Sequence, residues 1–484
     1  MASEAYVLAA LAVPLAGALL IGLFGRWPNV REGTTLATAA LLLWCVVSLL
    51  APVLAGERPV AQVTEILPGL AIAFRVEPLG MLFALIASGL WIVNSLYSIG
   101  YMRGNDEQHQ TRFYVCFALA LAATMGIALA GNLFTLFIFY ELLTLVTYPL
   151  VTHAGSDEAR RGGRTYIGLL MGTSIMFLLP ALIITWAVAG TTDFTVGGIL
   201  ADRLDPLSLG ALLALFVFGL GKAALMPFHR WLPAAMVAPT PVSALLHAVA
   251  VVKAGVFSVV KVVLYVFGLG TLGAAGGADW LVGIAGFTIV AASLVALKAS
   301  NLKRMLAYST VSQLSYIVMA TALLAPLSVI GAVLHIAAHA LGKITLFFAA
   351  GAIYTAAHKT EIGELDGIGR RMPWTMTAFA IGALSMIGLP PAVGFVSKWY
   401  MLSGAMQTSQ AFAIAVIVVS TLLNAGYFLP IVYRAFFRVP TGPGHGEAPW
   451  PMVVALTATA AGAVLLFFAV DLPLALARQL VEGG

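Results

Sequence analysis

An apolar segment in the second half of the chain carries three ionisable groups at helical spacing. In LHIAAHALGKITLFF, residues 334–348, His335, His339 and Lys343 stand at i, i+4 and i+8, so an α-helix would place them on one face. Two histidines four residues apart have the geometry of a zinc site. A file of groups that can each gain and lose a proton is equally typical of a proton path. The remaining sequence has to decide between the two.

The composition indicates a membrane protein. Of the 484 residues, 61% are hydrophobic and 9% are charged, with a mean hydropathy of +1.00, whereas a soluble domain has about 25% charged residues. Apolar runs of about 20 residues predict membrane-spanning helices, not the short alternating strands of a barrel. We therefore expect an all-α polytopic membrane protein with 14 transmembrane helices. The expected spans lie near 5–24, 34–55, 78–101, 113–130, 133–152, 165–189, 207–229, 241–269, 278–298, 305–324, 327–356, 374–403, 411–437 and 450–470.

The basic residues predict which ends of these helices face the cytoplasm. If the N-terminus lies outside, 16 Lys and Arg residues fall in the inner loops and four fall outside, a strong positive-inside asymmetry. The inner set is Arg26, Arg31, Arg103, Arg112, Arg160, Arg161, Arg164, Arg230, Lys298, Lys303, Arg304, Lys359, Arg370, Arg371, Arg434 and Arg438, and the outer set is Arg58, Arg75, Arg203 and Arg478. The net charge of +5 thus reflects topology, and we expect no nucleic-acid partner.

Topology does not explain the charges that fall inside predicted spans. These are Glu141 and the five lysines Lys222, Lys253, Lys261, Lys343 and Lys398. An ionisable group at the centre of a membrane helix costs about 2.5–3.5 kcal/mol on insertion scales, so such groups are functional candidates by default. Lys261 is the exception, because it lies toward the outer end of its span and its long side chain could snorkel to the surface.

Glu141 is the one acid that we place in the middle of a span, in LFTLFIFYELLTLVTYPL. Burial favours the neutral carboxyl and a nearby ammonium favours the carboxylate, so a partner could switch its protonation. A static ion pair with one of the buried lysines remains the alternative.

Two predicted spans combine a lysine with helix-breaking residues. Lys222 lies five residues before Pro227 in FGLGKAALMPFHRWLP, and Lys398 lies seven residues after Pro391 in MIGLPPAVGFVSKWYM. Paired interrupted helices indicate an ion site in an inverted-repeat transporter. We therefore expect four segments, listed here by residue range: three leading helices in 1–112, a first five-helix repeat in 113–270, a second in 271–438 and a final helix in 439–484.

His247 and Lys253 occupy one further span, in PTPVSALLHAVAVVKAGVFSVVKV. A desolvated lysine and a histidine can both take up and release protons near neutral pH. A histidine that merely satisfies hydrogen bonds within the core is the alternative for His247.

The chain starts with an acidic rather than a basic leader, MASEAYVLAALAVPLAGALLIGLF, which we interpret as a retained first helix. Cys45 and Cys116 stand alone in apolar spans and define neither a disulfide framework nor a metal cluster.

Six motifs in order resemble the proton-translocating antiporter-like family. They are FYELLTL, GKAALMPFHRWLP, APTPVSALLHAVAVVKAGVF, LKRMLAYSTVSQLSY, LHIAAHALGK and GLPPAVGFVSKWYM. This family is shared by the D and A subunits of Mrp-type multisubunit Na+/H+ antiporters and by the pumping membrane subunits of respiratory complex I. The resemblance covers roughly residues 75–438. It implies 14 helices, with two inverted five-helix bundles that each contain a broken helix.

The resemblance also implies a set of site residues and a subfamily. The family's buried ionisable positions fall on Glu141, Lys222, His247, Lys253, His335, His339, Lys343 and Lys398. Lysine rather than glutamate at position 398 looks closest to the D subunit of Mrp antiporters. Only 46 residues follow Arg438, too few for the long lateral helix of the distal complex I subunit. Asn132, Asn301 and Glu77 stand where many members have aspartate.

These features predict a proton-translocating subunit of a multisubunit monovalent cation/H+ antiporter in the bacterial inner membrane. The alternative within the same family is a pumping subunit of a complex I-like or membrane hydrogenase complex. A metal-dependent membrane enzyme is a third hypothesis. It is weakened because Ile336, not glutamate, follows His335 and because Lys343 would repel a metal ion.

Partners and cofactors follow from the preferred hypothesis. We expect no cofactor and no resident metal, and we expect other membrane subunits, protons, monovalent cations and the lipid bilayer as partners. The sequence does not distinguish Na+ from K+, because no dense carboxylate site for a hard cation occurs in the spans.

Overall fold

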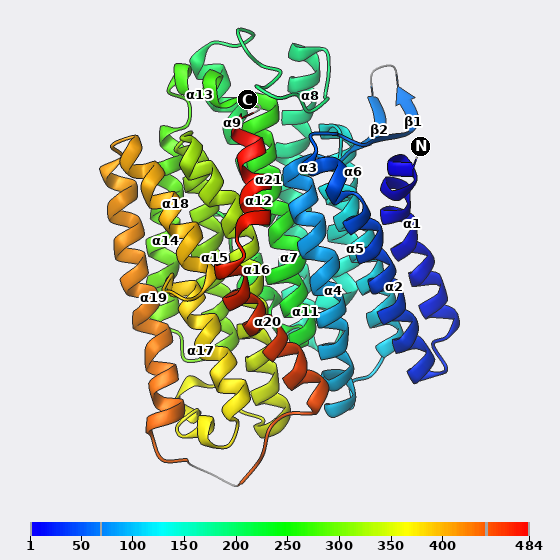
Figure 1. Cartoon of the computed structure of the whole chain (residues 1–484), viewed down its shortest axis with the longest axis vertical. Helices are drawn as coiled ribbons and strands as arrows, with labels where there is room; N and C mark the ends of the chain where they lie inside the picture. The colour runs from blue at the N-terminus through cyan, green and yellow to red at the C-terminus, as the bar shows by residue number, and fades with distance from the viewer. Residues whose placement is uncertain (1, 68–69, 441–443, 483–484) are drawn as a thin grey trace.

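Long helices running side by side make up almost all of the molecule, with one small β-hairpin at one end (Figure 1). The computed structural model describes residues 2–67, 70–440 and 444–482. Both termini lie toward the end of the helix bundle that carries the hairpin (Figure 1). The expected all-α polytopic architecture is confirmed.

The leading helices form one side of the bundle. They are α1 (Ala2–Leu23), α2 (Pro28–Ser48), the short α3 (Leu50–Leu54) and α4 (Pro78–Gly104). Strands β1 (Val60–Leu67) and β2 (Leu70–Arg75) pair antiparallel between α3 and α4. The hairpin is tied to the bundle because Arg75 donates its backbone N–H to the carbonyl of Leu129 at 2.7 Å.

The first of the two central groups runs from α5 to α13. Its members are α5 (Gln110–Ala128), α6 (Leu133–Val151), α7 (Asp157–Thr173), η1 (Ser174–Leu178), α8 (Leu179–Ala189), α9 (Pro206–Gly219), η2 (Gly221–Ala223), α10 (Trp231–Ala234), η3 (Ala235–Val237), α11 (Thr240–Ala244), η4 (Leu245–Val249), α12 (Val251–Val262), η5 (Val263–Phe267) and α13 (Leu269–Ala275). The second central group and the C-terminal helices are α14 (Asp279–Lys298), α15 (Leu302–Ala322), α16 (Pro326–Ala357), η6 (Ile362–Glu364), η7 (Ile368–Arg370), α17 (Pro373–Ile387), α18 (Val393–Gln407), α19 (Ala411–Phe437), α20 (Trp450–Phe468) and α21 (Asp471–Glu482).

Eleven helices in the described part of the chain are long and apolar enough to cross a membrane. The expected count of 14 is not confirmed by this criterion and stays a prediction. Two of the other expected spans correspond to the interrupted helices that contain the shorter α9 and α17, and the third corresponds to α15. The chain is therefore a multi-pass membrane protein.

Two helices are interrupted where glycine and proline were expected to break them. After α9 the chain forms the 3₁₀ turn η2, and Ala224 then adopts a left-handed backbone with φ of 55°. After α17, Gly388 has φ of 91° and a helix resumes at Val393. Each break contains a proline, which lacks the backbone N–H that a helix needs and crowds the preceding turn, and a left-handed residue that turns the chain out of the helix.

Close backbone approach holds the first break in place. A Cβ on Gly255 of α12 would lie 2.2 Å from the backbone nitrogen of Ala223, so only glycine lets α12 pass directly against η2. At the second break, a Cβ on Gly388 would lie 2.6 Å from the side chain of Lys398. At both breaks a glycine therefore packs against the expected site: Gly255 packs against the turn that contains Lys222, and Gly388 packs against Lys398.

Two helices at the centre of the molecule are almost completely buried over their most apolar stretches. The most apolar stretch of Thr240–Phe267 is buried along its whole length, and that of Pro326–Ala357 is 94% buried, compared with 33% for α1. Polar groups on these two helices are therefore separated from lipid by a full layer of protein. Because of this central position, the two helices can hold ionisable side chains within the membrane without exposing them to lipid.

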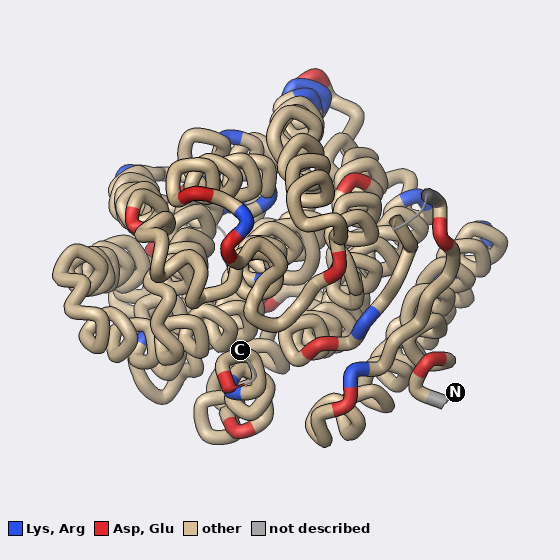
Figure 2. The backbone as a smooth tube through the Cα atoms, turned by 90° about the horizontal axis from the view of Figure 1, so that it is seen from above, with Lys and Arg blue, Asp and Glu red and all other residues tan. Residues whose placement is uncertain are grey.

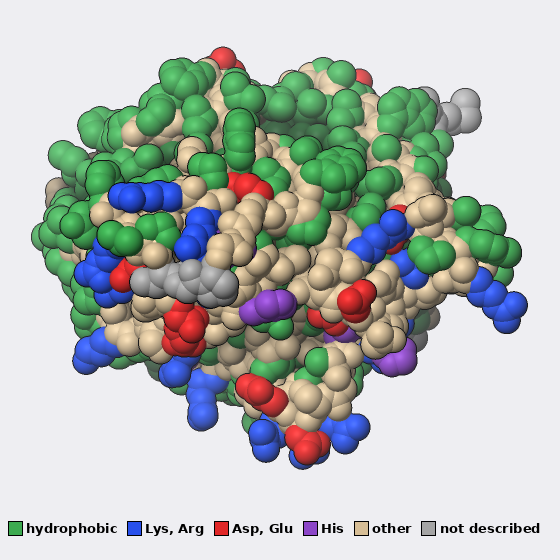
Figure 3. All heavy atoms as spheres, turned by 90° about the horizontal axis from the view of Figure 1, so that it is seen from below, with side chains coloured by type: hydrophobic (Ala, Val, Ile, Leu, Met, Phe, Trp, Pro, Cys, Tyr) green, Lys and Arg blue, Asp and Glu red, His purple; other side chains and the backbone are tan. Residues whose placement is uncertain are grey.

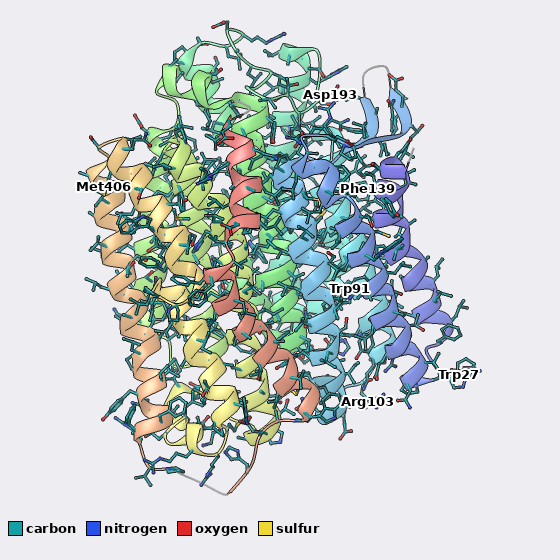
Figure 4. All side chains as sticks on the ribbon, in the orientation of Figure 1. Trp27, Trp91, Arg103, Phe139, Asp193 and Met406 are labelled. Atoms are coloured by element: carbon teal, nitrogen blue, oxygen red, sulfur yellow. The ribbon has the colours of Figure 1, made fainter. Side chains whose placement is uncertain are left out.

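Charges lie mostly at the two ends of the bundle. Seen from above, charged residues occur mainly at loops and helix ends (Figure 2), and the lower end shows many Lys and Arg side chains (Figure 3). Arg103 lies at that lower end, whereas Asp193 lies at the upper end (Figure 4). The N-terminus-outside orientation stays a prediction.

Candidate functional site

Lys222 lies inside the first helix break, fully buried. Its Nζ donates to the backbone carbonyl of Tyr140 at 2.8 Å and lies 3.2 Å from the centre of the Tyr140 ring. The Tyr140 hydroxyl in turn accepts the backbone N–H of Lys222 at 3.0 Å. The helix break leaves the backbone N–H of Lys222 without a helical partner, and the Tyr140 hydroxyl of α6 accepts it. The carbonyl and the ring of the same tyrosine hold the ammonium.

Glu141 follows Tyr140 on α6, and its carboxylate is shielded from solvent. Within the described residues, neither of its oxygens has a hydrogen-bond partner. No ion pair joins it to Lys222 in that part of the chain, where Lys222 instead bonds to the neighbouring carbonyl. The Glu141 carboxyl therefore lies beside the residue that holds Lys222 without being fixed by a hydrogen bond of its own. The static ion pair that was the alternative is not observed.

His247 and Lys253 lie in the central helical segment that runs from α11 to α12, and both are fully buried. His247 lies in the π-turn η4, with its ring 4.7 Å from that of Phe347 on α16. Among the residues that the structure describes, its ring nitrogens have no hydrogen-bond partner. The alternative of a core histidine with satisfied hydrogen bonds therefore does not describe this site.

A direct hydrogen bond links the two central helices. The Nζ of Lys253 on α12 contacts Nδ1 of His339 on α16. His335 lies one turn before His339, with 6.1 Å between the ring centres. One lysine and two histidines from separate spans thus lie next to one another in a buried row, Lys253, His339 and His335, which we call the file.

His335 continues this file toward the second helix break. Its Nδ1 lies 2.9 Å from the hydroxyl of Ser397 on α18, and its Nε2 lies 3.0 Å from Oε1 of Gln313 on α15. The amide nitrogen of Gln313 donates to the carbonyl of Met386 at 3.3 Å, and Lys398 donates to the same carbonyl at 2.9 Å. Hydrogen bonds thus connect His335 with the surroundings of Lys398.

Lys398 closes the end of α17. Its Nζ donates to the carbonyls of Met386 and Ile387 at 2.9 and 3.0 Å, which are C-terminal carbonyls that the break leaves without helical partners. The ammonium also lies at the negative end of the α17 dipole. Its position above the Tyr316 ring, 4.8 Å from the centre, adds a cation–π contact.

Lys343 does not lie between the two histidines of α16 and Lys398. It follows His339 on α16 by one turn, so it lies on the side away from His335. Its Nζ donates to the Ser309 hydroxyl of α15 at 2.6 Å. Lys343 is therefore a branch of the file and does not link His335 to Lys398.

Comparisons with known proteins agree with this arrangement. Residues 130–424 match the family described as NADH:quinone oxidoreductase/Mrp antiporter, transmembrane. That stretch is more than half of the chain and contains every expected site residue. The chain belongs to this family.

Individual members of the NADH:quinone oxidoreductase/Mrp antiporter family are similar over most of this chain. NADH-quinone oxidoreductase subunit N of Desulforudis audaxviator is 33% identical over 92% of this chain and 88% of that protein. The A/B component of a probable K+/H+ antiporter from Rhizobium meliloti is 32% identical over 88% of this chain. The chain spans only 43% of that second relative's length.

Solved structures share the fold. A chain of the Mrp complex from Dietzia sp. superposes with a TM-score of 0.88 at 23% identity, covering 99% of this chain and 97% of that chain. A chain of an archaeal membrane-bound sulfane sulfur reductase gives 0.87 at 23% identity, with the same coverage. The family architecture is thus present from end to end.

Lys261 does not snorkel, contrary to the sequence-based interpretation. It is fully buried and forms an ion pair with Glu77 at 3.1 Å, and it donates to the carbonyl of Ala130 at 2.6 Å. The ring of Phe194 lies 4.4 Å from its Nζ. Sequence reasoning missed this because Glu77 lies in a connecting segment 184 residues earlier. The pair ties the start of α4 to α12 and the α5–α6 connection.

Several polar residues around the file were not identified from the sequence. Ser309, Gln313, Ser397, Asn424 and Tyr427 are buried and hydrogen-bond to the expected groups or to each other. The signal available was weak, since single serines and amides are common in membrane helices. Their importance depends on which helices face one another.

The donor set does not favour a metal site at the histidine stripe. His335 has both ring nitrogens engaged by Ser397 and Gln313, and one nitrogen of His339 faces the Lys253 amine. Within the described ranges, no group of three or more His, Cys, Asp or Glu residues is placed to hold a metal ion.

Proposed function

We propose that this chain is the proton-translocating subunit of a multisubunit monovalent cation/H+ antiporter. The observation that carries the proposal is the buried series that runs from Lys253 through His339 and His335 to the Met386 carbonyl, which Lys398 contacts at the second helix break. The named antiporter relatives and the Mrp fold support it. Lysine at position 398 supports a D-type subunit.

Protons pass between neighbouring groups of this series, such as Lys253 and His339, whose nitrogen atoms are in direct contact. They enter toward Glu141 and Lys222, pass through His247 and Lys253 to the histidines of α16, and leave near Lys398. The residues of this path, in order, are Glu141, Lys222, His247, Lys253, His339, His335 and Lys398, with Lys343 as a branch.

Each lysine alternates between ammonium and amine as its neighbours change state. A buried ammonium disfavours a second charge nearby, so loading one lysine promotes release from the next. Glu141 supplies the one opposing charge, next to the carbonyl that holds Lys222.

The scaffold consists of two inverted repeats, 113–270 and 271–438. Asn132 caps α6 and Asn301 caps α15, 169 residues later. Asn132 forms an isolated β-bridge with Asp193, and Asn301 forms one with Glu361. These matched contacts support the division of the chain.

The chain acts in the bacterial inner membrane with its N-terminus outside, together with other membrane subunits. Glu141 is the only acid that we place in the path, and no dense carboxylate site accompanies it, so the Na+ or K+ route lies in a partner subunit. The chain alone, reconstituted in vesicles, should show no Na+- or K+-dependent proton exchange. Clear exchange by the chain alone would contradict this division of labour.

The decisive experiment uses the whole complex in sealed vesicles. Imposed Na+ or K+ gradients should drive proton flux, and Glu141→Ala or Lys222→Ala should abolish the flux while the variant subunit remains in the complex. Unchanged flux in either variant would refute the proposal.

The second candidate is a pumping subunit of a redox-driven complex. Subunit N of NADH-quinone oxidoreductase, covered over 88% of its length, favours it. Proton flux from the purified complex that requires an electron donor and acceptor, and is indifferent to Na+ and K+ gradients, would select this candidate. Flux driven by cation gradients alone would select the antiporter.

A further inference from the structure

Three fully buried side chains from three helices meet at the His335 end of the file. The Nδ1 of His335 on α16 lies 2.9 Å from the hydroxyl of Ser397 on α18, and its Nε2 lies 3.0 Å from Oε1 of Gln313 on α15. A Cβ on Gly331, one turn before His335, would lie 2.6 Å from the backbone nitrogen of Met401, so glycine there lets α16 approach α18 closely. Each ring nitrogen of His335 therefore has its own partner.

The amide of Gln313 has its orientation fixed from its other side. Its Nε2 donates to the backbone carbonyl of Met386 at 3.3 Å, and a carbonyl oxygen can only accept. Turning the amide would bring Oε1 against that carbonyl oxygen, so Oε1 has to be the atom that faces His335. Lys398 donates to the same carbonyl and to that of Ile387. A neutral lysine keeps two N–H donors for these two carbonyls, so the orientation of Gln313 does not depend on the charge of Lys398.

This orientation determines which ring nitrogen of His335 keeps its proton. Oε1 of Gln313 is only an acceptor, so Nε2 has to carry an N–H toward it. The tautomer with its proton on Nδ1 alone would place the lone pair of Nε2 against Oε1, and both atoms would be buried without a donor. Neutral His335 therefore has its lone pair on Nδ1. A proton that His335 gains or loses is the one on Nδ1.

Ser397 fits both states of Nδ1 because its hydroxyl has two partners. Its single proton can point to Nδ1 or to the carbonyl of Gly394, which lies 3.0 Å away and one turn earlier on α18. When His335 is neutral, the hydroxyl donates to the lone pair of Nδ1. When His335 is charged, the Nδ1–H donates to the hydroxyl oxygen, and the hydroxyl proton turns to Gly394. Both states keep every hydrogen bond with the heavy atoms in the same places.

No acid opposes a positive charge on His335 at ion-pair distance in the part of the chain that the structure describes. The titratable groups that face its ring are His339 and Lys343 on its own helix, Lys253 on α12, Lys398 on α18 and Tyr316 on α15. Neutral acceptors must therefore stabilise the charged ring. The Gln313 amide oxygen and the Ser397 hydroxyl oxygen are placed to do so, one at each ring nitrogen.

We propose that Gln313 and Ser397 are positioning residues that make His335 exchange protons at Nδ1 alone. Gln313 holds the N–H of Nε2 in both charge states, and Ser397 turns its hydroxyl between Nδ1 and the Gly394 carbonyl as the Nδ1 proton arrives and leaves. The exchanging nitrogen then faces α18, the helix that carries Lys398. This rests on the proposed function only in that His335 gains and loses a proton.

NMR of the histidine ring nitrogens tests the assignment without measuring transport. The whole complex is prepared in membranes with histidine labelled with carbon-13 and nitrogen-15, and the His335 signals are identified by their loss in His335→Gln. Each nitrogen is recognised by the ring carbons to which it is bonded, and protonated and unprotonated nitrogens resonate far apart. We expect neutral His335 to carry its proton on Nε2, and acidification to change the Nδ1 signal from unprotonated to protonated.

Two results of this measurement on the native complex would overturn the proposal. One is a neutral His335 that carries its proton on Nδ1, and the other is a Nδ1 that stays unprotonated over the whole pH range in which the complex is intact. A complex that shows the predicted tautomer and protonation but no cation-driven flux would retain the proposal and refute the proposed function.

Gln313→Met tests the role of Gln313, because it removes the acceptor and keeps a side chain of similar length. The neutral ring should then shift toward the tautomer with its proton on Nδ1, since the Ser397 oxygen remains as an acceptor and Oε1 is gone. Ser315→Ala is the matched control on α15, because its buried hydroxyl donates to the carbonyl of Val311 on its own helix at 3.0 Å, and it should keep the native tautomer. An unchanged tautomer in Gln313→Met would contradict the role of Gln313.

Ser397→Ala tests the turning hydroxyl. The charged ring loses a charge-assisted hydrogen bond and the neutral ring loses a weaker one, so protonation of Nδ1 should require a several-fold higher proton concentration. The proton on Nε2 should stay in place, because Gln313 still accepts it. The same dependence of the Nδ1 signal on pH in the native complex and in Ser397→Ala would contradict the role of Ser397.

Discussion

In the first half of the chain Lys222 is part of the helix break itself, whereas in the second half Lys398 lies on α18 beyond the break. Lys222 reaches across to a carbonyl on the neighbouring helix α6, beside the shielded carboxyl of Glu141. Lys398 instead folds back onto the carbonyls at the end of α17. One lysine is held by a partner helix with an acid nearby, and the other by the broken helix.

The comparison teaches that the scaffold repeats while the charges do not. The ends of α9 and α17 are 168 residues apart, close to the spacing of the caps Asn132 and Asn301. The position 169 residues after Glu141 is Thr310, and the position 169 residues before Lys398 is His229 rather than a lysine. An acid near one lysine favours its charged state, and helix carbonyls near the other do so without a titrating partner. In the proposed mechanism, this asymmetry distinguishes the lysine of the first break from the lysine beyond the second.

The largest effect is expected from Lys222→Gln and Lys398→Gln. An amide still donates hydrogen bonds to the carbonyls but cannot carry a proton, so both variants should lose transport by about 100-fold or more. Flux in vesicles, with subunit content checked in parallel, measures this. If Lys398→Gln alone kept its rate, Lys398 would be a cap of α17 and not a proton carrier.

The ion pair between Lys261 and Glu77, in the first half of the chain, should affect stability more than transport. Lys261→Met leaves Glu77 buried without its partner and should reduce the free energy of unfolding by about 3–5 kcal/mol. The double variant Lys261→Met/Glu77→Leu should recover much of that loss, because no uncompensated charge remains. Denaturant unfolding of all three proteins checks this, and a double variant no better than the single one would contradict it.

The two matching caps should differ in a smaller but measurable way. Asn132 accepts from the backbone of Thr135 at 2.8 Å and also donates to Ala71 at 2.9 Å while buried. Asn301 caps the backbone of Arg304 at 3.1 Å and donates to the Glu361 carboxylate at 3.1 Å, nearer the surface. Alanine at either position should cost about 0.5–2 kcal/mol, with Asn132→Ala at the upper end. Equal thermal shifts for the two variants would remove this distinction between the halves.

A pH-dependent effect on stability is expected at His153, in the turn after α6. Burial lowers the pKa of His153 to about 4, and the Arg112 guanidinium adds to this, so its contact with Glu107 at 3.8 Å is not an ion pair at neutral pH. A depressed histidine pKa contributes stability above about 6.5 that is lost as the pH falls toward 4. Melting temperatures should therefore decline over this window in the native protein and decline less in His153→Leu. Parallel declines would rule out this assignment.

Much of the fold followed from the sequence because apolar runs mark helices that lie in lipid. The runs near 133–152 and 411–437 match α6 and α19 closely. The run at 165–189 missed the start of α7 at Asp157, since the helix begins with polar residues behind the cap Ser156. The run at 374–403 could not show where α17 ends and α18 begins.

The site could be predicted only in part from the sequence. Buried lysines and histidines stand out because few charges occur in apolar spans, so each expected residue could be named. Their order could not, because the position of Lys343 depends on Ser309 of another helix. Contacts such as Lys261 with Glu77 join segments far apart in the sequence, where no spacing rule applies.

The central claim is that buried lysines of the file must lose their protons, and substitution by arginine tests it most directly. Arginine keeps a positive charge but does not release its proton in proteins. Lys253 and Lys261 are both fully buried on α12, eight residues apart, so Lys253→Arg and Lys261→Arg are matched. Cation-driven proton flux in vesicles should be abolished by Lys253→Arg and retained by Lys261→Arg, which keeps its ion pair. Native flux in Lys253→Arg would contradict the account.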